Sequence, residues 1–381
     1  MLFGATLALN ASFFMLIPIF PVYVTGTLGL SAAAAGFVLA VRQFSQNVPM
    51  VLGGAVADRF SHRLTMVAGL VARAVGFIGL GYATDLSTLT LAAIVAALGG
   101  CCFDAASRAA VARLVPADER LKAFAILSTV FVIGSTVGPL AGVAALGQGF
   151  TFVCLLGAGW LLAAAVTIVL FVPGTADAPQ GGASIRQSLV TALADRAFLR
   201  FSVLCTGQWL LGSVLYVALP LHVAALTGGP EAVGLLFSMY AGILLVLQYP
   251  VASFTARRMT PRARLASGLA ASSIGFTLIG LMGGLPGLIA CLAIIAVGRM
   301  LTDPTFNEMV THLAPPGSVA TYVGLGYLGL GIGGAIGNLT AGVLFDLAAE
   351  FKLLWAPWLI YGLVGLILAV LFRRLTFAVP S

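Results

Sequence analysis

The few charged side chains that interrupt the apolar segments of this chain are the first candidates for chemistry. Arg42, Arg73 and Arg299 each stand within a long run of hydrophobic residues. If such runs cross a lipid bilayer, a charge near its centre costs roughly 2.5 to 3.5 kcal/mol even on permissive scales. Each arginine therefore needs a partner or a purpose, such as contact with a bound molecule.

The spacing of polar residues around these arginines indicates two local arrangements. Arg42 precedes Gln46 by four residues, so both side chains share one face of a helix, and Gln43 stands beside them. We interpret this polar stripe as part of a cavity or of an interhelical network, with purely structural hydrogen bonding as the alternative. Arg299 and Asp303 have the same spacing, and an intrahelical pair would offset the cost of burying both charges. We expect this pair to line the cavity as well, with a purely structural pair as the alternative.

Other polar and aromatic side chains inside apolar segments are further candidates for the wall of a cavity. The alternative for each of them is a packing residue whose polar end forms a hydrogen bond. They are Asn10, Gln208, Trp209, Tyr216, Tyr240, Tyr327 and Asn338.

Nothing in the sequence supports an enzymatic or metal-dependent role. No nucleophile stands with a base, no phosphate-binding loop occurs, and the five cysteines fall inside apolar segments without the spacing of a metal site. The net charge of +7 comes from basic residues that stand singly or in pairs beside hydrophobic segments. We therefore expect no cofactor and no nucleic-acid partner.

The elements that must position these residues are apolar helices. Of the 381 residues, 60% are hydrophobic and 8% charged, whereas soluble domains carry about 25% charged residues. Apolar runs of roughly 20 residues recur along the chain, each long enough to cross a bilayer as a helix. We therefore expect an all-α integral membrane protein with twelve spans, near residues 2–24, 32–57, 64–84, 88–107, 121–145, 150–172, 198–224, 232–254, 265–283, 287–307, 318–345 and 353–372.

The basic residues predict how these spans are oriented. Fifteen of the nineteen Lys and Arg residues fall in loops on one side, which the positive-inside rule places in the cytoplasm, together with both termini. A polar stretch with Gly and Pro separates the sixth span from the seventh. We expect two six-helix bundles, residues 1–172 and 198–381, joined by a cytoplasmic linker at 173–197.

An internal repeat relates the two bundles. A shift of 199 residues pairs Asp104 with Asp303 and Pro116 with Pro315, and it pairs several glycines in the same register. Chance matches between glycines are expected in so glycine-rich a chain, but matches of a membrane Asp and of prolines are not. Two parallel six-helix repeats predict an architecture in which one rigid half rocks against the other around a central site.

One loop is similar to a signature of the major facilitator superfamily. The segment from Gly54 to Arg63, which includes Asp58 and Arg59, resembles the G-x-L-a-D-r-x-G-r-r signature between the second and third spans, although Ser61 replaces its second Gly. We expect a charge cluster here that locks one conformation, because ion pairs count for more at a low-dielectric border. Two residues near the end of the fourth span are placed to join this latch, Asp104 and Arg108.

A second resemblance lies in the fifth span. Gly134, Gly138, Pro139 and Gly142 resemble the g-x-x-x-G-P-x-x-G antiporter signature, which marks exporters in this superfamily. Such a segment is predicted to form a closely packed, kinked helix whose bend seals one side of a cavity. With further matches in the second, fourth and eleventh spans, the chain resembles the MdtH-like multidrug efflux group of the drug/proton antiporters over essentially its whole length.

This resemblance implies a secondary active transporter that exports amphipathic small molecules by alternating access across a bacterial inner membrane, with the proton as coupling ion. We expect a monomer whose partners are a small-molecule substrate and the lipid bilayer. The resemblance also places the third span at the periphery, where we expect Arg73 in a structural pairing.

The residues themselves leave two alternatives open. The middle of the first span holds no Asp or Glu, so proton coupling rests on the resemblance alone. Because the charges nearest the centre are positive, an exporter or facilitator of anionic metabolites without proton coupling is the first alternative. A non-transporting membrane receptor or scaffold is the second.

Overall fold

The described part of the chain is helical. The computed structural model describes residues 2–50, 61–114, 119–172, 185–315 and 319–374, which contain helices and short connections but no strand. The helices are α1 (Leu2–Leu16), α2 (Phe20–Gly26), α3 (Ala32–Asn47), α5 (His62–Tyr82), α6 (Leu86–Leu114), α7 (Arg120–Leu146), α8 (Phe150–Phe171), α9 (Ile185–Ala194), α10 (Arg196–Thr227), α11 (Glu231–Ala256), α12 (Pro261–Leu281), α13 (Leu285–Leu313), α14 (Val319–Glu350) and α15 (Ala356–Arg374).

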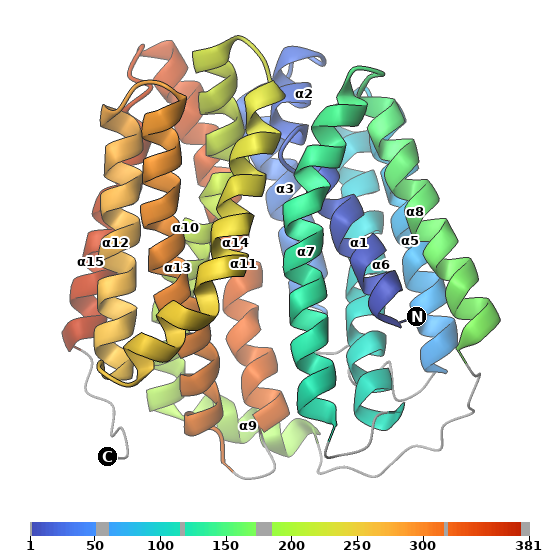
Figure 1. Ribbon diagram of the computed structural model, residues 1–381, viewed down its shortest axis with the longest axis vertical. Helices are drawn as coiled ribbons and strands as arrows, with labels where there is room; N and C mark the ends of the chain where they lie inside the picture. The colour runs from blue at the N-terminus through green and yellow to red at the C-terminus, as the bar shows by residue number, and fades with distance from the viewer. Residues whose placement is uncertain (1, 51–60, 115–118, 173–184, 316–318, 375–381) are drawn as a thin grey trace.

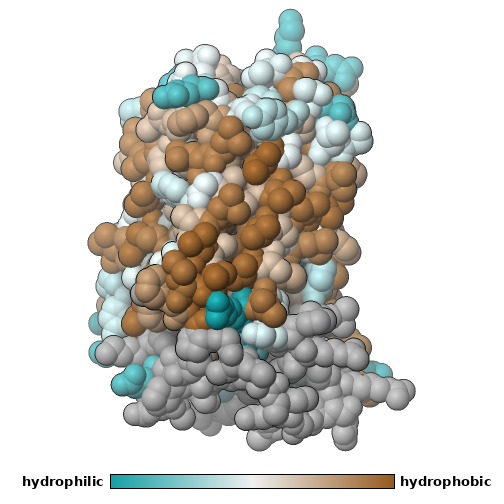
Figure 2. All heavy atoms as spheres, turned by 90° about the vertical axis from the view of Figure 1, so that its right-hand side faces the viewer, coloured by the Kyte–Doolittle hydropathy of each residue, from teal (hydrophilic) through white to brown (hydrophobic). Residues whose placement is uncertain are grey.

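Most of these helices have the length and composition of membrane spans. Within the described residues, 11 segments are long and apolar enough to cross a membrane, with α1 and α2 counted as one. Figure 2 shows a broad hydrophobic band on one face of the molecule, below a more hydrophilic end. The prediction of an all-α, multi-span membrane protein is confirmed, although the end of the second predicted span lies outside the described residues.

The helices form two halves that repeat one packing scheme (Figure 1). In the first half α5 packs on α6 and α8, and α1 packs on α7 and α8; in the second, α12 packs on α13 and α15, and α10 packs on α14 and α15. A shift of 199 residues carries the bounds of α5 onto those of α12 and the bounds of α6 onto those of α13. The internal repeat read from the sequence is therefore present in the structure.

Glycines let the central helices of each half cross closely. A Cβ atom added to Gly69 would lie 2.7 Å from the Gly99 carbonyl oxygen, and one added to Gly268 would lie 2.7 Å from the Gly298 carbonyl oxygen. Because backbone atoms cannot move aside as a side chain can, these crossings require glycine. They fix the distance between α5 and α6 and between α12 and α13.

Two features differ from the predicted elements. The first span is broken by a turn at residues 17–19, where Pro18 and Pro21 supply no backbone N–H for a continuous helix. The linker at 173–197 contains a helix, α9, which lies across the end of the molecule opposite α2 (Figure 1). We call these two ends of the molecule the α2 end and the α9 end.

Candidate functional site

The centre of the first half holds two arginines against one aromatic ring. The guanidinium carbons of Arg42 on α3 and Arg73 on α5 lie 4.5 Å and 5.4 Å from the centre of the Phe13 ring on α1. Arg73 is only 2% exposed, and Gly100 on α6 leaves space for its guanidinium, since a Cβ atom at residue 100 would clash with Arg73 Nη1. Three helices of this half thus bring two positive charges to one place.

Arg42 is held by neutral neighbours. It donates to Gln46 Oε1 at 2.7 Å and to Gln43 Oε1 at 2.6 Å. Gln46 Nε2 in turn donates to Asp104 Oδ2 on α6 over 3.4 Å, a long hydrogen bond. The polar stripe predicted on the second span is therefore an interhelical network that links α3 to α6.

Arg73 has no such support. Its Nε and Nη1 atoms are buried and have no hydrogen-bond partner among the described residues. Asp104 lies within electrostatic range, but no ion pair joins the two. The buried side chain has Phe13 and Phe77 as its aromatic contacts and forms no ion pair with a described residue, so the structural pairing expected for Arg73 stays a prediction.

The centre of the second half holds a closed ion pair instead. Arg299 Nη2 lies 2.8 Å from Asp303 Oδ2 one turn along α13, and Gln208 on α10 donates to the other carboxylate oxygen at 3.2 Å. Tyr240 on α11 lies close enough to interact electrostatically with both charges. The intrahelical pair expected from the spacing is present, and it leaves this centre without net charge.

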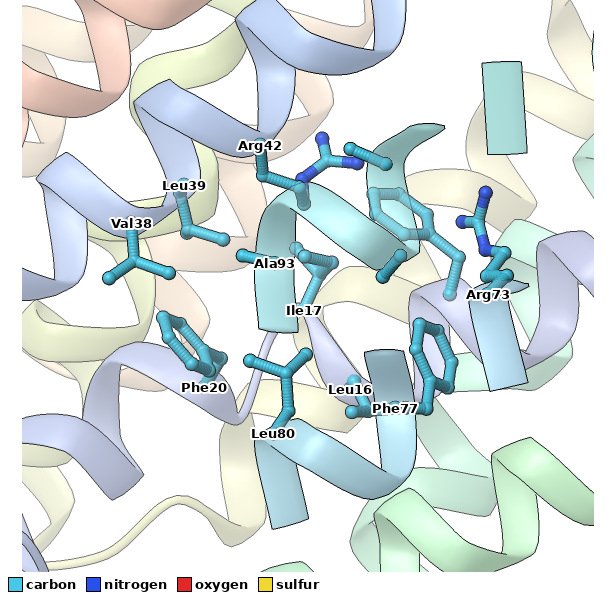
Figure 3. Close-up of a pocket in the computed structure, with 13 residues that line it drawn as sticks. Leu16, Ile17, Phe20, Val38, Leu39, Arg42, Arg73, Phe77, Leu80 and Ala93 are labelled. Carbon is cyan, nitrogen blue, oxygen red and sulfur yellow. The ribbon is translucent and has the colours of Figure 1, made fainter. Parts of the chain in front are cut away.

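Each half also has a pocket beside its charged centre, and the pocket of the first half is the more apolar of the two. The first pocket lies between helices of the first half; in Figure 3, Arg42 and Arg73 lie at one end of it, and Phe20 and Leu80 lie at the other. The second pocket lies between α10, α12 and α13 and includes Arg299 and Asp303. Residues related by the 199-residue shift line both pockets: Phe13 and Gly212, Arg73 and Ser272, Phe77 and Phe276, and Ala96 and Ile295.

Most of the contact between the halves comes from two helix pairs. At the α2 end, α3 packs along α14, where a Cβ atom on Gly36 would clash with the Asn338 carbonyl oxygen and one on Gly342 would clash with the Ala32 carbonyl oxygen. Asp346 on α14 accepts hydrogen bonds of 2.8 Å from the backbone N–H groups of Ala32 and of its neighbour at residue 33. These groups at the start of α3 would otherwise lack partners, so the contact holds this end of the interface.

The second pair, α7 with α11, is the counterpart of the first under the repeat. Ser238 donates to the Thr136 carbonyl oxygen at 2.7 Å, and a Cβ atom on Gly234 would lie 2.7 Å from the Pro139 carbonyl oxygen. The residue equivalent to Asp346 here is Gly147, which supplies no carboxylate. The two helix pairs are therefore similar in packing but different in charge.

The predicted antiporter motif packs inside its own half. Cβ atoms on Gly134 and Gly138 would lie 2.8 Å from Asn10 Cβ and 2.6 Å from the Ala11 carbonyl oxygen, and one on Gly142 would clash with α1 in the same way. The glycines thus seat α7 on α1, while Pro139 lies on the side that faces α11.

Half of the predicted latch falls outside the described residues, namely Gly54, Asp58 and Arg59. Arg63 donates to the Val169 carbonyl oxygen of α8, a contact within the first half. Asp104 and Arg108 lie one turn apart on α6 and interact electrostatically. Whether these residues form a latch stays a prediction.

The remaining predicted cavity residues are divided between the centre and the walls. Asn10 donates back to the Thr6 carbonyl oxygen, and Asn338 is buried against α3. Tyr216 lies within electrostatic range of both Arg42 and Arg299, so it stands between the two centres. Trp209 and Tyr327 form an aromatic group around Phe306.

Sequence reasoning missed two residues of this arrangement. Phe13 is one of 24 phenylalanines, and nothing in its spacing marks it as the ring between two arginines. Asp346 stands at the end of an apolar span, where a solvated loop residue is the ordinary interpretation. Its partners are backbone groups more than 300 residues away in the sequence, which no local pattern signals.

Taken together, the helices and the central charges define a polytopic membrane protein with two repeated halves and a polar centre in each. The major facilitator superfamily model matches residues 2–217 and 203–381. The chain is 33% identical over 353 residues to the multidrug resistance protein MdtH of Aeromonas hydrophila subsp. hydrophila, an alignment that covers 93% of this chain and 89% of that protein. It is 32% identical over 359 residues to MdtH of Photorhabdus laumondii subsp. laumondii, with 93% and 88% covered.

Solved structures show the same fold at low sequence identity. A POT family transporter in complex with a thioalcohol conjugated peptide superposes with a TM-score of 0.81 at 16% identity, over 97% of this chain and 94% of that one. The nucleoside transporter NupG gives a TM-score of 0.81 at 14% identity, over 97% and 98%. The chain belongs to the major facilitator superfamily, a family of membrane transporters and not of enzymes.

Proposed function

We propose that this chain exports amphipathic small molecules across the bacterial inner membrane by alternating access, with the proton as coupling ion. The relatives named multidrug resistance protein support the direction and the substrate class. The α9 end, where the basic loops gather in the sequence, is then cytoplasmic together with both termini.

The observation that carries this proposal is the closed contact between the halves at the α2 end. Gly36 and Gly342 allow backbone atoms of α3 and α14 to touch, and Asp346 adds two hydrogen bonds. This contact runs along α3 and α14, and each of these helices also packs on helices of its own half. It fits one of two alternating states, in which opening this end breaks the contact while each half stays intact.

Proton coupling requires a group that changes its protonation between the two states. Asp104 is the best candidate, because its carboxylate lies in a membrane span, makes no ion pair with any described residue and shares its centre with Arg73. Asp303 is less suited, since its carboxylate is already paired with Arg299. A positive centre beside Asp104 also favours the export of anions as the second candidate function.

Transport by purified protein in liposomes that enclose a pH-sensitive dye tests this proposal. After a proton gradient is imposed, we expect amphipathic test compounds to dissipate it and Asp104→Asn to move the same compounds without proton flux. Gly36→Ala and Gly342→Ala should each lower transport more than tenfold, because the added methyl group prevents closure of the α2 end.

The matched control is Gly159→Ala, since no atom lies within 4 Å of a Cβ atom placed there. If no test compound dissipates the proton gradient in liposomes with wild-type protein, proton-coupled export is wrong. If Gly36→Ala transports as well as Gly159→Ala, closure of the α2 end is not part of the cycle.

A further inference from the structure

The centre of the first half carries more positive charge than it can neutralise. Arg42 and Arg73 lie close enough to repel each other, and Asp104 is the one carboxylate of this centre in the described part of the chain. Formally, two positive charges face one negative charge. The two hydrogen bonds of Arg42 go to neutral amides, which orient its guanidinium but supply no charge.

Several donors of this centre are unused. Arg73 Nε and Nη1 and Arg42 Nε are buried without a hydrogen-bond partner among the described residues. A buried donor on a charged group is costly unless something binds it, and a guanidinium presents its donors in a planar fork. A carboxylate has one oxygen for each of the two guanidinium groups and brings the missing negative charge.

The pocket beside the two arginines is apolar. The pocket that extends from them is lined by hydrophobic side chains, with Phe20 and Leu80 at the far end from the guanidinium groups (Figure 3). A ligand held here would place a charged group at one end and an apolar group at the other. This arrangement selects amphipathic acids over inorganic anions.

We propose that Arg42 and Arg73 bind the carboxylate of an amphipathic substrate whose apolar part contacts the adjoining pocket. The proposal deepens the transport function proposed above and rests on it. The second half offers no equivalent site, because Asp303 already occupies the donors of Arg299, and Ser272 stands where the first half has Arg73.

Binding to protein in lipid nanodiscs, without any proton gradient, tests the proposal separately from transport. The probes are radiolabelled benzoate, benzamide and benzylammonium, which share one ring and differ in charge. Since a hydrogen bond to a charged group contributes about one to two powers of ten in affinity, we expect benzoate to bind at least tenfold more tightly than benzamide. Benzylammonium should bind most weakly.

Four variants test which residues cause the preference for benzoate over benzamide. Arg42→Gln and Arg73→Gln should each remove it, with little change for benzamide. Gly100→Ala keeps both charges but displaces the Arg73 guanidinium, so it should weaken benzoate binding alone. The control is Arg258→Gln, because Arg258 also lies over a phenylalanine ring, 4.4 Å from the centre of Phe254, but is exposed and outside the pocket.

The outcomes separate the site from the transport function. Loss of the preference in Arg73→Gln and Gly100→Ala, but not in Arg258→Gln, supports the site even if no probe is exported. Equal binding of benzoate and benzamide to wild-type protein overturns it, as does a preference that survives Arg73→Gln, even if export is found. A thermal unfolding transition shows whether each variant is folded. If Arg73→Gln does not fold, Gly100→Ala still tests the role of Arg73.

Discussion

The two halves of this transporter differ in how they accommodate a buried arginine. Each places an arginine at a close crossing of two helices, but in the first half it stands on α5 opposite Gly100 and in the second it stands on α13 opposite Ser272. On α13, Arg299 is one turn from Asp303 and pairs with it. On α5, Arg73 pairs with no carboxylate of the described residues, so the same frame leaves one centre neutral and the other positive.

This difference teaches how a duplicated membrane protein acquires two differently charged centres without new architecture. The crossings at Gly69 and Gly99 and at Gly268 and Gly298 fix the same backbone geometry in both halves. Moving the arginine from one side of the crossing to the other changes its partners but not the packing. The predictions below test first what the halves share and then what separates them.

The largest effect is expected at the shared crossings. Gly99→Ala and Gly298→Ala place a Cβ atom 2.5 Å from the carbonyl oxygen of the partner helix in each half, so both should lower the free energy of unfolding by about 2 to 3 kcal/mol. Denaturation in detergent micelles measures this, with Gly159→Ala as a control that should cost nothing. If the two variants lose clearly different amounts of unfolding free energy, the two crossings are not equivalent.

A smaller effect should separate the charged centres. Asp303→Asn leaves Arg299 without its charge partner and should lower the free energy of unfolding by about 2 kcal/mol, less than for a fully buried pair because both side chains are 26% exposed. Asp104→Asn breaks no ion pair with a residue that the structure describes, and it should cost less. The same denaturation experiment compares the two, and an equal or greater loss in Asp104→Asn would contradict the assignment of the closed pair to the second half.

The smallest effect is expected at Gly100→Ala. The added methyl group meets the end of the flexible Arg73 side chain rather than backbone, so the free energy of unfolding should fall by less than about 1 kcal/mol. Gly99→Ala at the adjacent position is the matched comparison in the same assay. A loss as large as that of Gly99→Ala would show that Arg73 is rigidly held, which the unpartnered donors argue against.

Much of this fold could be predicted from the sequence because its signals are local or repeated. The spans follow from uninterrupted apolar runs, and α8 at Phe150–Phe171 lies within one residue of the predicted range. The break at residues 17–19 was missed because a proline that one span tolerates breaks another. Helix α9 was missed because a short amphipathic helix in a polar linker has no distinctive composition.

The site was predictable only within single helices. The Arg42–Gln46 and Arg299–Asp303 contacts follow from four-residue spacing, which the helix converts directly into contact. The place of Arg73 against Phe13 depends on how α1 and α5 pack, and the contact of Asp346 with the start of α3 depends on how the halves meet. Neither follows from spacing along the chain.

The most direct test makes the first half copy the second. In the double variant R73S/G100R, the introduced guanidinium stands one turn before Asp104, as Arg299 stands before Asp303, so it should form a closed pair. The net charge of the centre is unchanged, but the open guanidinium at residue 73 is gone and Arg42 stands alone. The measurement is the ratio of benzoate to benzamide affinity in nanodiscs. We expect a ratio of at least about ten in wild-type protein and close to one in R73S/G100R. A ratio that stays above ten in the folded double variant would contradict the account, because the acid would then be recognised without the open charge at Arg73.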